Sequence, residues 1–68
     1  MTDMTKKEQV VYDYIVWYRK AMGNSPSMWE IATGVGLHSV STVHWHVHSL
    51  IDKGWLLSLD NGYRAVPV

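Results

Sequence analysis

The side chains with the widest chemical range lie close together between residues 41 and 53. This segment holds hydroxyl, imidazole and indole groups, at Ser41, Thr42, His44, Trp45 and His48. Short hydroxyls can bond base edges or phosphates, and imidazoles titrate near neutral pH. An indole can stack on a sugar, touch a thymine methyl group or fill a pocket on a protein partner. The group therefore indicates recognition of a nucleic acid or of another protein.

The histidines also raise the question of a metal site. His44, His48 and Asp52 recur at intervals of four residues, which places them on one side of a helix. Zinc needs three or four converging ligands, and nothing in the sequence directs the other candidates, Glu30 and His38, toward this helix. We therefore predict no metal and no cofactor. We expect the histidines to face solvent or DNA, where protonation beside phosphate would tighten binding as the pH falls.

The composition favours a small binding domain over an enzyme. The 68 residues bury too little surface for a deep catalytic pocket. The sequence shows neither paired carboxylates on one element nor a glycine loop that could cradle phosphate. Without cysteine there is no disulfide or thiolate chemistry. There is also no apolar signal segment and no apolar run of membrane-spanning length. We predict a cytoplasmic, non-enzymatic protein that does not associate with membranes.

The charge balance neither supports nor excludes nucleic acid. Six Lys and Arg residues match six Asp and Glu residues. Many DNA-binding domains carry a basic excess, because neutralising phosphates and releasing counterions supplies much of their affinity. Among the candidate phosphate contacts, Lys53 and Arg64 are the best placed. The full set of cations is Lys6, Lys7, Arg19, Lys20, Lys53 and Arg64.

Two capping boxes predict two helix starts. In Thr5-Lys6-Lys7-Glu8 the hydroxyl and the carboxylate can each accept a backbone N–H of the first turn, so a helix is expected over about 6–22, with Gly23 as its stop. Ser27-Met28-Trp29-Glu30 repeats the box and predicts a helix over about 28–34. The apolar face of the first helix is expected to comprise Val11, Tyr14, Ile15, Tyr18 and Met22.

A third helix is predicted over about 41–53, before Gly54. At about 100° per residue its apolar stripe comprises Val43, Val47, Leu50 and Ile51. The opposite side comprises Ser41, Trp45, His48, Ser49 and Asp52. His44 and His46 lie on the flanks, and we expect His46 to be partly buried and bonded to backbone. A serine near the start either caps the helix, contacts DNA or does both.

A β-hairpin is predicted over about 55–66, around the turn Asp60-Asn61-Gly62. Three helices followed by a hairpin define a mainly α fold with a small β element, the winged helix-turn-helix, as a single domain over 1–68. The remaining large aromatic residues are expected in its core. They are Trp17, Trp29, Trp55 and the four tyrosines.

The ordered set of these motifs resembles the N-terminal DNA-binding domain of the LexA repressors, a family of bacterial SOS regulators. The residues that carry the resemblance are Thr5-Lys6-Lys7, Val11-Tyr12-Asp13-Tyr14-Ile15, Gly23, Pro26-Ser27, Glu30-Ile31-Ala32, Gly36-Leu37, Ser41-Thr42-Val43-His44-Trp45-His46 and Leu50-Ile51-Asp52-Lys53-Gly54. The match covers nearly the whole chain.

The resemblance implies a transcriptional regulator whose third helix reads bases in double-stranded DNA, bound to a palindromic operator as a homodimer. Carried over by position, the base-reading residues are Ser39, Ser41, Thr42, His44 and Trp45. The residues expected at the DNA backbone are Ser27, His38, His48, Lys53, Asn61 and Arg64.

Three features depart from the family pattern. LexA repressors continue into a self-cleaving Ser-Lys peptidase domain, which is not expected here because the sequence ends at Val68. Trp45 is bulkier than expected for a base-reading residue, and three histidines alternate in one helix. An alternative function is therefore a protein-interaction domain that does not bind DNA and uses an exposed Trp45. DNA binding predicts an affinity that falls with added salt, whereas partner binding predicts a salt-insensitive contact.

Overall fold

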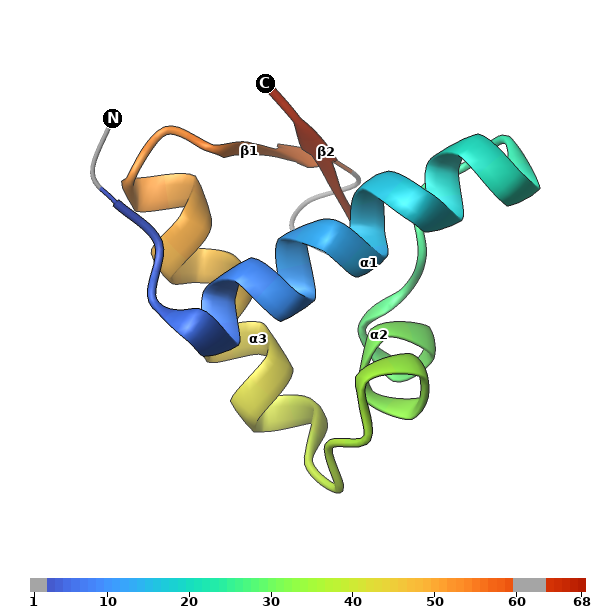
Figure 1. The fold of residues 1–68 in the computed structure, drawn as a ribbon, viewed down its shortest axis with the longest axis horizontal. Helices are drawn as coiled ribbons and strands as arrows, with labels where there is room; N and C mark the ends of the chain where they lie inside the picture. Colours follow the sequence, from blue (N-terminus) through green and yellow to red (C-terminus); the bar gives the residue numbers. More distant parts are fainter. Residues whose placement is uncertain (1–2, 60–63) are drawn as a thin grey trace.

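The computed structural model describes residues 3–59 and 64–68, and it confirms the predicted fold class. Three helices precede an antiparallel pair of strands (Figure 1). The elements are α1 (Lys6–Met22), α2 (Met28–Val35), α3 (Val40–Asp52), β1 (Leu56–Leu59) and β2 (Arg64–Pro67). The strands pair Leu56 with Pro67 and Leu59 with Arg64. The predicted turn at Asp60-Asn61-Gly62 lies outside the described residues.

Both predicted capping boxes form, because each needs only four consecutive residues. Thr5 Oγ1 accepts the Glu8 N–H at 3.2 Å, and Ser27 Oγ accepts the Glu30 N–H at the same distance. Each glutamate in turn accepts the N–H of its capping residue at 2.8 Å. α1 ends at Gly23, whose φ of 83° lies in the left-handed region that glycine adopts without strain.

α3 begins one residue before its predicted start and ends one residue before its predicted end. Its cap is Ser39, whose Oγ accepts the Thr42 N–H at 3.4 Å. Ser41 therefore lies inside the first turn, where its hydroxyl is not needed as the cap.

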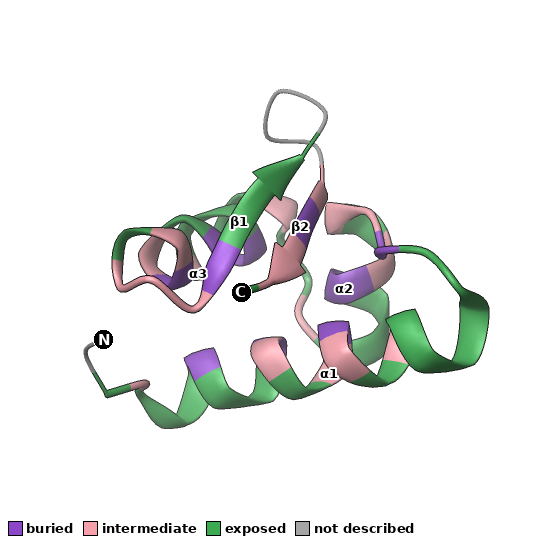
Figure 2. Ribbon diagram, turned by 90° about the horizontal axis from the view of Figure 1, so that it is seen from above, coloured by how far each residue is buried: buried purple, intermediate pink, exposed green. Residues whose placement is uncertain are grey.

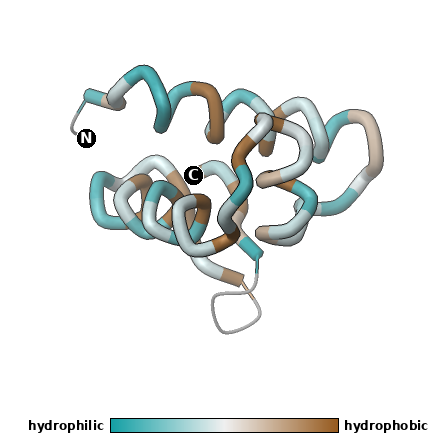
Figure 3. Tube along the Cα trace, turned by 90° about the horizontal axis from the view of Figure 1, so that it is seen from below, coloured by the Kyte–Doolittle hydropathy of each residue, from teal (hydrophilic) through white to brown (hydrophobic). Residues whose placement is uncertain are grey.

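The core lies where the three helices and the hairpin face one another. α3 packs against α1, α2 and β1, and in Figure 2 the buried positions of each helix lie on its inward side. Figure 3 shows hydrophobic and hydrophilic segments alternating along each helix, as expected when one side is buried. The buried apolar residues are Val11, Ile15, Ile31, Ala32, Val43, Val47, Leu50, Leu56 and Ala65.

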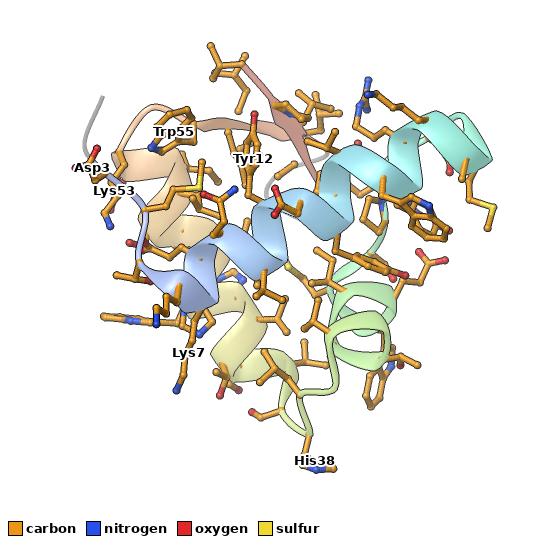
Figure 4. The ribbon with its side chains drawn as sticks, viewed as in Figure 1. Asp3, Lys7, Tyr12, His38, Lys53 and Trp55 are labelled. Carbon is orange, nitrogen blue, oxygen red and sulfur yellow. The ribbon has the colours of Figure 1, made fainter. Side chains whose placement is uncertain are left out.

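The prediction that the large aromatic residues form the core is wrong for two of those that the structure describes, and Tyr63 lies outside the described residues. Trp17 is 54% exposed and Trp29 is 71% exposed. Each lies two residues from a buried isoleucine, Ile15 or Ile31, and two residues turn a helix by about 200°, to its opposite side. Trp55 does pack inward, with its ring 5.9 Å from that of Tyr12 in an edge-to-face arrangement (Figure 4).

Two expectations for α3 are also corrected. His46 is partly buried, but its buried Nε2 has no hydrogen-bond partner among the described residues, so the expected backbone bond is absent there. Ser49, expected on the outward side, is only partly exposed. Its hydroxyl donates to the Glu8 carboxylate on α1, because the flank of α3 beside Leu50 lies against that helix. Within the described part of the chain, no helix is long and apolar enough to cross a membrane.

Candidate nucleic-acid interface

The start of α3 brings the predicted base-reading residues together on an exposed surface. Ser39, Ser41, Thr42, His44 and Trp45 are all exposed, and they occupy the cap and the first half of the helix. Trp45 is 74% exposed, as its position opposite the apolar stripe predicted. Since Val43, Val47 and Leu50 are buried behind it, α3 separates an anchoring side from a polar and aromatic side.

The outer side of α3 also carries a shallow hollow of about 160 Å³. It is lined by Trp45, His48, Ser49 and Asp52. Their spacing of three and four residues gave the signal for such a surface, because these intervals bring side chains together on a helix. The hollow can receive a small protruding group, but it is too open and small for an enclosed ligand.

His44 and His48 form a close pair one turn apart. Their ring centroids lie 4.2 Å apart, with the ring planes inclined at 62°. The third residue of the predicted series, Asp52, does not complete a cluster. Residues 3–59 and 64–68 contain no group of three His, Cys, Asp or Glu side chains that could hold a metal ion.

Lys53, predicted to contact the DNA backbone, has partners inside the domain. Its Nζ lies 2.5 Å from Glu8 Oε1 and 3.2 Å from the Asp3 carbonyl oxygen (Figure 4). Glu8 is almost fully buried, while the Lys53 side chain is 21% exposed. The hydrogen bonds from Lys53, Ser49 and Thr5 lower the pKa of Glu8 from 4.5 to about 2. We call Glu8, Ser49 and Lys53 the Glu8 cluster.

Arg64, the other cation predicted to contact the backbone, is also engaged internally. Its guanidinium donates to the carbonyl oxygen of buried Ser25, while Arg19 donates to the Ser25 hydroxyl at 2.6 Å. The positive charge of Arg64 also helps to stabilise the Glu30 carboxylate. The sequence did not reveal these uses, because the partners of Lys53 and Arg64 are distant in the chain.

Glu30 links the start of α2 to the last turns of α1. One oxygen accepts the Ser27 N–H, and the other accepts the Tyr18 hydroxyl at 2.5 Å. The bonds from Ser27 and Tyr18 lower the pKa of Glu30, and the bond to Glu30 raises the pKa of Tyr18. We call Tyr18, Ser27 and Glu30 the Glu30 cluster. Because Ser27 caps α2 here, its hydroxyl oxygen already accepts one bond.

The remaining residues predicted at the DNA backbone differ in accessibility. His38 is exposed at the turn between α2 and α3, where Figure 4 shows it at the tip of the loop. His48 is exposed on α3. Asn61 lies outside the described residues. The other cations, Lys6, Lys7, Arg19 and Lys20, are exposed along α1.

Comparison with known proteins places this arrangement in a family. Residues 1–65 match the LexA DNA binding domain. The LexA repressor of Oceanobacillus iheyensis is 40% identical over all 68 residues, and that of Koribacter versatilis is 38% identical over the same length. The LexA repressor of Staphylococcus haemolyticus is also 38% identical.

The match to these relatives covers the whole chain but only part of each relative. All 68 residues are covered, but they span only 32–33% of the length of these three curated relatives. With three helices, an antiparallel hairpin and an exposed polar face on α3, the chain belongs to the LexA DNA-binding-domain family.

Proposed function

We propose that the domain recognises a specific sequence in double-stranded DNA, as the DNA-reading part of a transcriptional repressor. The observation that carries this proposal is the division of α3 into a buried apolar side and an exposed side of hydroxyl, imidazole and indole groups. In helix-turn-helix proteins the second helix of the motif enters the major groove, and its N-terminal residues contact base edges. Exposed hydroxyl groups of α3 lie at that end.

The proposed base contacts follow from the chemistry of each side chain. The hydroxyls of Ser41 and Thr42 can donate to or accept from base edges, and Trp45 offers an apolar surface to a thymine methyl group or a sugar. His44 adds an imidazole on the neighbouring flank. Ser39 uses its oxygen to cap α3, which leaves its O–H free to donate.

The proposed backbone contacts are Ser27, His38, His48, Lys53, Asn61 and Arg64. His38 and His48 are exposed, whereas Lys53 and Arg64 would have to share their charge with internal partners. The number of phosphates neutralised is then small, and we expect a shallow dependence of DNA affinity on salt. Binding of two copies to a palindromic operator is what the family resemblance implies.

The test begins with selection of bound fragments from random duplex DNA, followed by anisotropy titrations with the selected sequence. A palindromic product is expected. Trp45→Ala and Ser41→Ala should each weaken binding about tenfold, which corresponds to about 1.4 kcal/mol for one lost base contact. Trp17→Ala is the matched control, because Trp17 is also exposed but lies on α1. Random selection without enrichment would overturn sequence-specific binding, as would equal losses for Trp45→Ala and Trp17→Ala.

The alternative is a protein-interaction domain that uses Trp45. The neutral net charge and the 74% exposure of Trp45 favour it, since aromatic residues are enriched at protein interfaces. Such a domain would show no salt-dependent DNA binding. It would instead bind a protein partner through a contact that Trp45→Ala abolishes and added salt leaves unchanged.

A further inference from the structure

His44 and His48 bring their imidazole rings close together on the outer side of α3. DNA recognition by α3 does not require this short distance between the rings. Both residues are exposed on α3, and their ring centroids lie 4.2 Å apart. Neither ring takes part in a hydrogen bond or an ion pair within residues 3–59 and 64–68, so their nitrogens remain open to an external ligand. Two open imidazoles on successive turns of one helix form a pair of ligands that can reach the same ion.

We propose that His44 and His48 together bind one divalent transition-metal ion of the Cu²⁺, Ni²⁺ or Zn²⁺ class. Imidazole suits all three ions, and residues four apart on a helix face the same direction, so both rings can coordinate one ion. Water fills the remaining coordination positions. The general order of divalent affinities predicts that Cu²⁺ binds more tightly than Ni²⁺ or Zn²⁺.

The neighbouring groups set the character of this site. Asp52 lies eight residues from His44, about 12 Å along the helix axis, so it cannot ligate the same ion as that ring. Its carboxylate is one turn beyond His48 and adds a favourable negative charge. With two protein ligands rather than three or four, the site binds reversibly, and the fold does not depend on it.

Metal binding has a consequence that rests on the proposed function. His44 is among the residues proposed to read bases, and His48 among those proposed at the backbone. An ion held between them, with its water ligands, would occupy the surface that has to approach the groove. Metal and DNA therefore compete for the outer side of α3.

The direct test is a calorimetric titration of the full chain with CuCl₂ and then ZnCl₂. One ion per chain is expected, and His44→Gln or His48→Gln should each lower the affinity at least tenfold, because the chelate is reduced to one ring. His38→Gln is the matched control, since it removes an exposed histidine from the turn and should change the affinity less than twofold. Wild-type affinity in both pair variants would overturn the site, and so would an equal loss in His38→Gln. Circular dichroism verifies that each variant is folded.

A second titration tests competition on the selected DNA. Saturating Zn²⁺ should weaken DNA binding by the wild type at least fivefold, EDTA should restore it, and His48→Gln should not respond. Unchanged DNA affinity while calorimetry shows the ion bound would overturn competition. If the metal-free protein binds no DNA, the proposed function fails, whereas the metal site is judged by calorimetry alone.

Discussion

The two capping boxes have the same local structure, but their glutamates differ in burial. Glu8 and Glu30 each cap a helix and each use a second oxygen to reach another helix. Glu8 is buried, and Ser49 and Lys53 of the α3 region surround it. Glu30 is partly exposed and receives the Tyr18 hydroxyl. The Glu8 cluster therefore adds a buried polar link between α1 and the α3 region, while the Glu30 cluster links α1 to α2 at a partly exposed position.

The internal partners of two cations bear on the neutral net charge of the chain. Lys53 and Arg64 are engaged by Glu8 and Ser25, so they stabilise the frame that presents α3. Their charges do not depend on phosphate for a partner. Under the proposed function, we therefore expect recognition to rely on hydrogen bonds and apolar contacts from α3 more than on a basic surface.

The largest expected effect is the loss of the buried carboxylate. Glu8→Ala removes the partner of Lys53 and Ser49 together with half of a capping box, and we expect the free energy of unfolding to fall by about 3 kcal/mol. Glu30→Ala should have a clearly smaller effect, because its carboxylate is partly solvated. Urea unfolding followed by tryptophan fluorescence measures both. Equal losses would show that burial does not distinguish the two clusters.

Removal of the cation should come second. Lys53→Met keeps most of the side-chain length but leaves the Glu8 carboxylate without its ion pair, at a cost of about 1–3 kcal/mol. Combining it with Glu8→Gln should cost less than the sum of the two single changes, because the groups are in contact. Additive losses in this double-mutant cycle would argue against a direct interaction.

Acid should weaken the Glu8 cluster over a defined range. The folded-state pKa of Glu8 is about 2 and its ordinary value is 4.5. A lowered pKa means that its stabilising contribution is complete above about pH 4.5 and is lost as the pH falls toward 2. The difference in melting temperature between wild type and Glu8→Gln should therefore shrink from pH 6 to pH 2. A constant difference would contradict the lowered pKa.

The smallest effect should come from the Glu30 cluster. Tyr18→Phe removes one hydroxyl at a solvated site. It should therefore lower the melting temperature, relative to wild type, by less than Lys53→Met does. The same contact is visible in a spectroscopic titration, because the bond to Glu30 raises the pKa of Tyr18. In Glu30→Gln the tyrosinate absorbance of Tyr18 should appear at lower pH than in wild type, with Tyr18→Phe identifying its signal. The same onset in both proteins would rule out the contact.

Local features of this fold could be predicted from the sequence, and long-range features could not. The capping boxes, the stop at Gly23 and the outward position of Trp45 depend on a few consecutive residues or on helix period alone. The same period places Trp17 and Trp29 opposite buried isoleucines, so their exposure follows from position although both side chains are hydrophobic. By contrast, Ser49 and Lys53 are 41 and 45 residues from Glu8, and nothing local indicates those bonds.

In the candidate site, too, features that depend on helix period could be predicted, and features that depend on side-chain conformation or packing could not. The exposure of Ser41, Thr42 and Trp45 follows from their angles around α3. The short distance between His44 and His48 depends on side-chain rotamers, which the spacing allows but does not determine. The lack of a partner for His46 Nε2 among the described residues could not be predicted, because it depends on how α3 packs beside α1.

The length of chain enclosed by the Glu8 cluster has a consequence for biosynthesis. Lys53 leaves the ribosome long after Glu8, so α1 and α2 can be helical in the nascent chain while the carboxylate still lacks its cation. Docking of α3 has to wait for nearly all of the domain to be translated, and an N-terminal fragment that stops before residue 49 cannot close the cluster. We therefore expect protease resistance to arise in one late step during synthesis.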